Sequence, residues 1–165
     1  MSNLTASFST RAVPDWRAAV WAGLIAGAVF MMLEMLLVSF FMNESPWAPP
    51  RMIAAIVLGQ GVLPPPAPFD FMVLMVAMVI HFILSVAYGL IFAWVAYRWT
   101  WGTALIAGAI FGIALYLINF YGFTLVFPWF AMARNWISIL SHLMFGIVLA
   151  GIYKGFEKGA SPLRP

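Results

Sequence analysis

Residues 71–97 form an apolar run without a single charged side chain. About 20 consecutive apolar residues suffice for a helix to cross the hydrocarbon core of a bilayer. Three further runs of this kind occupy residues 17–42, 102–126 and 135–153. Backbone polar groups in lipid must be satisfied within the chain, so continuous runs favour helices, whereas a β-barrel requires short alternating segments. The sequence therefore predicts an all-α membrane protein with four transmembrane helices in one domain, residues 1–165.

The composition agrees with an integral membrane protein. Hydrophobic residues make up 65% of the chain and charged residues only 8%, against roughly 25% charged in a soluble domain. The net charge of +3 comes from few residues, so it indicates membrane orientation and not nucleic-acid binding. The chain has no cysteine, which excludes disulfides, zinc–thiolate sites, thiolate nucleophiles and cysteine-attached haem.

The basic residues predict how the helices are oriented. Cytoplasmic loops of membrane proteins carry an excess of Lys and Arg. Only Arg51 and Arg134 fall on one side of the predicted membrane, and the other basic residues fall on the opposite side. We therefore expect both termini in the cytoplasm of a bacterium, with the chain in its inner membrane. The residues on the cytoplasmic side are Arg11, Arg17, Arg98, Lys154, Lys158 and Arg164.

The loop between the first two helices, residues 43–70, contains a short apolar piece between prolines. It reads "PPRMIAAIVLGQGVLPPP" (49–66). Proline suits the start of a helix and glycine its end, and the piece is too short to span a bilayer. We expect a helix at the outer face that lies at the interface or caps the bundle.

The chain contains an internal similarity. "GLIAGAVF" (23–30) recurs as "ALIAGAIF" (104–111), and "HFILSVAYG" (81–89) matches "HLMFGIVLA" (142–150) when the histidines are superposed. The four helices therefore read as two copies of one helical hairpin. Both copies run in the same direction, so we expect a pseudo-two-fold axis along the membrane normal.

Polar residues in the spans predict one layer inside the bundle. The repeat makes His81 and His142 equivalent, and residue spacing places both in the outer half of the membrane. Glu34 and Asn119 lie at a matching depth in the first and third helices. Ionisable groups in a span are costly and usually face the bundle interior. The four side chains are therefore expected to meet.

Several uses of this layer are compatible with the sequence. One is packing alone, in which small neighbours allow close helix contact and the histidines are neutral and hydrogen-bonded. Another is a metal site formed by His81, His142 and Glu34, since such ligands suit Zn, Fe or Cu. A proton relay or a contact with a quinone is a further option.

A haem b site is the remaining alternative. His81 and His142 would ligate the iron across a gap lined by small residues. Arg51 and Arg134, on the outer side, would pair with the haem propionates, because arginine forms such carboxylate pairs well. Catalysis by the chain alone is not expected. It shows no serine–histidine–acid set outside this layer, no glycine-rich phosphate loop and no paired carboxylates.

The motifs resemble those of the YagU-type inner-membrane proteins. "GLIAG" in the first helix, "PPR" after an acidic residue, "HFILS" and "SHLMF" carry this resemblance over most of the four spans. It implies a small bacterial membrane protein linked to acid tolerance. The family's acidic residue precedes the proline pair, which matches Glu44 and not Glu34, and the first loop is built differently here. The residues that the resemblance marks are Glu44, Pro49, Pro50, Arg51, His81, Ser85 and His142.

These features lead to three functional hypotheses. The first is a non-catalytic accessory subunit of a bacterial respiratory-type membrane complex, a role that small aromatic-rich membrane chains often have. The alternatives are a haem b electron carrier and a stand-alone YagU-like envelope protein in acid or proton homeostasis. A transporter ranks below them because four short-looped helices with one polar layer offer little path for a solute unless the chain oligomerises. The expected partners are the lipid bilayer and either other membrane subunits or further copies of this chain.

Overall fold

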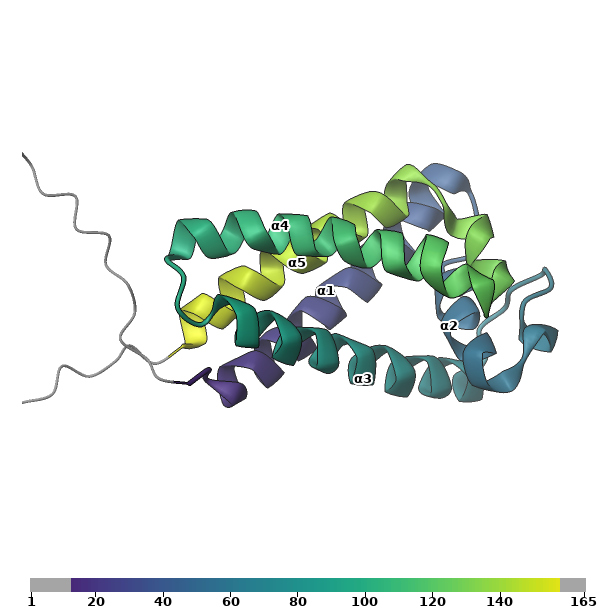
Figure 1. Ribbon diagram of the computed structural model, residues 1–165. Coiled ribbons are helices and arrows are strands. Elements are labelled where there is room, and N and C mark those ends of the chain that lie inside the picture. Colours follow the sequence, from purple (N-terminus) through teal and green to yellow (C-terminus); the bar gives the residue numbers. More distant parts are fainter. Residues whose placement is uncertain (1–12, 158–165) are drawn as a thin grey trace, which may run out of the picture.

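Four long helices with a short fifth helix at one end make up the computed structural model, which describes residues 13–157 (Figure 1). Each of the four segments is long and apolar enough to cross a membrane, α4 together with the helical turns that follow it. The prediction of an all-α bundle with four spans is confirmed. The long helices are α1 (Trp16–Met42), α3 (Phe71–Ala96), α4 (Trp101–Leu117) and α5 (Trp136–Phe156).

Polar residues directly before the apolar runs explain where the long helices begin. A side-chain oxygen at the N-cap satisfies a backbone N–H that would otherwise lack a partner. Asp15 and Asp70 accept from the N–H three residues on, each at 3.1 Å. Thr100 and Asn135 have the same role at α4 and α5. The start of each long helix is thus set by a polar residue in the local sequence.

The helix predicted in the first loop is present as α2 (Ala48–Leu58). Prolines occupy its first turn, where a missing N–H costs nothing. It ends at Gly59, whose φ of +79° favours glycine. Figure 1 shows α2 at the end of the bundle opposite the described chain ends.

The third span departs from a regular α-helix in its outer part. After Leu117 the chain forms a π-helical turn (Ile118–Gly122), in which the Phe123 N–H donates to the Ile118 carbonyl five residues back. A 3-10 turn follows at Phe123–Leu125. The sequence does not predict this deviation, because its apolar run continues without a break.

The helices pack in the order α3, α1, α5 and α4. In the most hydrophobic stretch of α5, 50% of the residues are buried, against 22% in that of α3, so α5 is the most buried of the four spans. Helices α3 and α4 follow one another in the chain, yet their backbones have little contact (Figure 1). Side chains fill the space between them in part, as for Phe92 of α3 and Phe111 of α4, whose ring centroids lie 5.5 Å apart.

Small residues bring the paired helices into close contact. A Cβ atom on Gly27 of α1 would lie 2.5 Å from the Ser85 hydroxyl of α3. A Cβ atom on Gly108 of α4 would collide with the Gly146 carbonyl of α5. In the internal alignment, Gly27 corresponds to Gly108 and Ser85 to Gly146, so the two contacts are at equivalent positions. The duplication itself stays a prediction.

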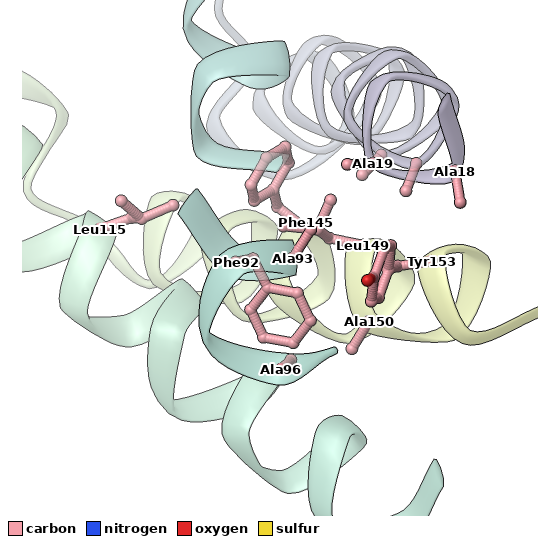
Figure 2. Close-up of a cluster of buried hydrophobic side chains, with 12 residues drawn as sticks. Ala18, Ala19, Phe92, Ala93, Ala96, Leu115, Phe145, Leu149, Ala150 and Tyr153 are labelled. Carbon is pink, nitrogen blue, oxygen red and sulfur yellow. The ribbon is translucent and has the colours of Figure 1, made fainter. Parts of the chain in front are cut away.

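A hydrophobic core closes the half of the bundle near the described chain ends. Figure 2 shows Phe92 of α3 beside Tyr153 of α5, with ring centroids 6.5 Å apart. Leu149 and Ala19 belong to the same buried cluster. This half of the bundle is therefore filled by packed hydrophobic side chains.

The described basic residues divide between the two ends of the bundle. Arg17, Arg98 and Lys154 lie at the helix ends near the described chain termini, and Arg51 and Arg134 lie near the opposite end. This distribution fits the predicted orientation, which stays a prediction. The other basic residues used for it, Arg11, Lys158 and Arg164, lie outside the described residues.

The contact between α4 and α5 predicts that alanine substitutions at two glycines of α4 have very different effects on the free energy of unfolding. Gly112→Ala places a methyl group against the His142 carbonyl, whereas nothing lies within 4 Å of the corresponding position at Gly102. Overpacking of this kind costs about 1–3 kcal/mol. We expect Gly112→Ala to lower the free energy of unfolding, measured by SDS titration in mixed micelles, and Gly102→Ala to leave it unchanged or raise it. Equal values for the two variants would contradict the packing.

Candidate intramembrane binding site

A cavity of about 330 Å³ lies in the half of the bundle near α2. Residues of all four long helices and of the π turn line it, and α2 and the 3-10 turn Pro128–Ala133 complete its outer wall. The Trp129 indole N–H donates to the Met52 carbonyl at 3.0 Å and joins these two outer segments. Most of the lining is apolar, and the polar residues are Glu34, His81, Ser85, Tyr88, Asn119 and His142.

The predicted polar layer is present in this pocket: Glu34, His81, Asn119 and His142 all line it. Tyr88 and Ser138 extend the layer, and the sequence analysis did not select them as site residues. Tyr88 follows His81 by seven residues, so helical spacing alone would have placed it on the same face.

A chain of hydrogen bonds connects the layer. The Tyr88 hydroxyl donates to Asn119 Oδ1 at 3.2 Å, and Asn119 Nδ2 donates to His142 Nε2 at 3.1 Å. His142 Nδ1 donates to the Ser138 carbonyl at 2.7 Å. The Ser138 hydroxyl donates to Glu34 Oε1 at 2.8 Å. The donors therefore all point along the chain toward the Glu34 carboxyl group.

These bonds fix the state of His142. A carbonyl oxygen only accepts hydrogen bonds, so the ring hydrogen is on Nδ1 and the lone pair of Nε2 accepts from Asn119. Both ring nitrogens are thus engaged in a neutral imidazole.

His81 is held differently. Its Nε2 donates to the Gly27 carbonyl at 2.8 Å, which leaves the lone pair on Nδ1. Within residues 13–157 no hydrogen-bond partner is present for that atom. His81 therefore offers an acceptor in the pocket.

A phenyl ring separates the two histidines. The Phe30 ring stacks on His81 with centroids 5.6 Å apart and meets His142 edge-on at 4.8 Å. Both Nε2 atoms are engaged in hydrogen bonds as well. This geometry gives no support to one iron between two imidazoles, and haem binding stays a prediction.

The two arginines proposed for haem propionates have other partners. Arg51 donates to the Val62 carbonyl at 2.8 Å and to the Pro68 carbonyl at 2.9 Å, which fixes the first loop. Arg134 donates to the Phe120 carbonyl of the π turn at 2.7 Å. Both side chains thus stabilise backbone at the outer end, and neither lines the pocket.

The metal hypothesis receives no geometric support either. In the part of the chain that the structure describes, no group of three or more His, Asp or Glu side chains is placed to hold one metal ion. The predicted set of Glu34, His81 and His142 is therefore not arranged as a metal centre here. Metal binding by these residues stays a prediction.

Glu34 is the most unusual group of the site. Only 6% of this residue is exposed. The Ser141 hydroxyl lies near its carboxyl group, although neither Glu34 Oε2 nor the Ser141 hydroxyl makes a hydrogen bond of normal geometry. Within residues 13–157 no Lys or Arg forms an ion pair with it. The pocket therefore contains a carboxyl group whose charge, when ionised, has no counter-charge from the described chain.

The fold and the site define a four-span helical membrane protein with a polar network at one wall of an apolar pocket. Neither a protein-family model, nor a curated protein, nor a solved structure matches the chain. The resemblance to the YagU-type proteins accordingly stays a prediction.

The network predicts that Asn119 matters more for stability than Tyr88. Asn119→Ala leaves His142 Nε2 and the Tyr88 hydroxyl without their partners, and unsatisfied buried groups cost about 1–3 kcal/mol each. Tyr88→Phe removes one bond at the end of the chain, which is worth about 0.5–1.5 kcal/mol. We expect this order in free energies of unfolding from SDS titration. A larger loss for Tyr88→Phe would show that the network is not connected as described.

Proposed function

We propose that this protein is a non-catalytic multi-pass membrane protein whose pocket binds a lipid-soluble molecule with a polar head group. The observation that carries the proposal is the pairing of an apolar cavity with polar groups that lack partners. Glu34 Oε2 is buried and makes no hydrogen bond of normal geometry, with the Ser141 hydroxyl as its polar neighbour, and His81 Nδ1 is an unused acceptor. Buried polar groups are nearly always satisfied, so exceptions mark places where a ligand or water completes the set.

The position of the pocket supports a ligand that arrives from the bilayer. The hydrophobic core blocks the half of the bundle near the chain ends, and α2 covers the opposite end. The backbones of α3 and α4 have little contact along this side, and Tyr88 bridges the two spans through its bond to Asn119. The outward faces of both helices carry exposed apolar residues such as Ile83 and Ile110, so a ligand that enters between them comes from the hydrocarbon of the bilayer.

The arrangement of the polar groups supports binding without turnover. His142 and Asn119 use their side-chain nitrogen and oxygen atoms within the network. Such groups position one another and do not take up or release a proton without breaking a bond. A fixed network with two open positions suits recognition of a head group.

We further propose that the protein is an accessory subunit of a bacterial respiratory-type membrane complex, with its termini in the cytoplasm. The basic residues at the end of the bundle near the chain termini support this orientation. A subunit that binds a lipid-soluble molecule suits an assembly that works on molecules dissolved in the bilayer. Migration at monomer or homodimer mass alone, on native gels of gently solubilised membranes, would contradict the subunit role.

Filling the pocket tests the binding function. The probe is a diazirine-bearing C16 alcohol, added to the protein in lipid nanodiscs and located by mass spectrometry after photolysis. We expect labelling at buried pocket residues such as Glu34 as well as at lipid-facing Ile83. Ala133→Trp fills the outer wall of the pocket and should reduce the pocket labelling roughly tenfold, which corresponds to about 1.4 kcal/mol of binding free energy.

The matched control is Ala131→Trp, in the same 3-10 turn but exposed and outside the pocket. It should leave labelling unchanged at both positions. Labelling confined to lipid-facing residues in the wild-type protein would refute the binding function.

A further inference from the structure

The negative charge of an ionised carboxyl group inside an apolar bundle needs a counter-charge. An ionised side chain at membrane depth is costly, and such residues usually pair with an opposite charge or lose their own. No Lys or Arg lines the pocket, and among residues 13–157 the ion pair present is Lys154–Glu157, near the other end of the bundle. Glu34 is therefore either protonated or paired with a cation that comes from outside the described chain.

The remaining wall of the pocket suits a cation better than an anion. The faces of aromatic rings attract cations, most strongly where water is excluded, and aromatic cages recognise quaternary ammonium groups. Phe30 lies against both imidazoles, so one ring of the wall adjoins the polar layer. Aromatic residues that line the pocket include Phe30, Tyr88, Phe120, Phe127, Phe130 and Phe145.

The other titratable groups do not supply a positive charge in this structure. His142 is neutral with both nitrogens engaged. His81, on α3, presents a lone pair, and Tyr88 is a phenol that donates to Asn119. The linings from α2, from α4 with its π turn and from Pro128–Ala133 contain no titratable side chain apart from these.

We propose that the pocket binds a lipophilic organic cation, of the quaternary ammonium or phosphonium class, in exchange for the proton of Glu34. The inference rests on the proposed function, because it names the class of ligand for the same pocket. The protonated carboxyl group releases its proton to water as the cation enters, and the carboxylate pairs with the cation. No covalent bond of the ligand forms or breaks, and the charge of the pocket is the same before and after.

Binding of tetraphenylphosphonium tests this inference. Equilibrium dialysis of the nanodisc-embedded protein should show saturable binding to the wild type. Glu34→Gln keeps the size of the side chain but cannot carry the negative charge, and we expect it to weaken binding at least about tenfold. Glu44→Gln is the matched control, because it makes the same change of charge at an exposed outer residue outside the pocket, and should bind as the wild type does.

Proton release by the wild-type protein is a second readout. It requires no variant, so it does not depend on whether Glu34→Gln folds. Each bound tetraphenylphosphonium should release about one proton into weakly buffered solution, as linkage between the two ligands requires. Affinity should accordingly fall as the pH falls, by up to roughly tenfold per pH unit while the carboxyl group is mostly protonated. Protonation of His81 or His142 at low pH would add repulsion, and this contribution remains in Glu34→Gln and can be subtracted.

The outcomes separate this inference from the proposed function. Tetraphenylphosphonium binding that releases no proton and is equal in the wild type and Glu34→Gln would overturn the exchange. Absence of tetraphenylphosphonium binding, with pocket labelling by the C16 alcohol probe intact, would overturn the cation class and leave the proposed function standing. Loss of both signals would remove the proposed function as well.

Discussion

The close approach of helix backbones at small residues is the contact on which the rest of the structure depends. Gly108 and Gly146 let α4 and α5 meet at their carbonyl groups, and Gly27 lets α1 meet Ser85 of α3. Helices α1 and α5 then join the two pairs at the centre. Because the backbone of each outer helix packs against its own partner, α3 and α4 contact one another mainly through side chains such as Phe92 and Phe111. The pocket is the space that this arrangement leaves.

The hydrogen-bonded network gives this pocket a polar wall with a defined arrangement of groups. Its donors run from Tyr88 through Asn119 and His142 to Ser138, and the last hydroxyl donates to Glu34. In an apolar surrounding, such a chain fixes the orientation of each member, because the alternative is an unsatisfied buried group. The π turn contributes Asn119 to this chain, and turns of this kind frequently occur at functional sites.

Much of the fold follows from the sequence, because apolar runs, N-cap residues and the proline–glycine bracket of α2 are local signals. The position of Glu34 and the two histidines in one pocket also followed from residue spacing. The position of Phe30 between the imidazoles did not, because a phenylalanine in an apolar helix carries no signal of its own. The roles of Arg51 and Arg134 were also not evident, since their partners are backbone carbonyls that no residue pattern identifies.

A cryo-electron microscopy map of the protein in lipid nanodiscs, with tetraphenylphosphonium present, tests the central claim most directly. The account predicts that α3 and α4 are separated at the level of His81 and Asn119. It also predicts ligand density between them, in contact with the Glu34 carboxyl group. A map in which α3 and α4 pack together along their length, with Glu34 paired to a basic side chain, would contradict it.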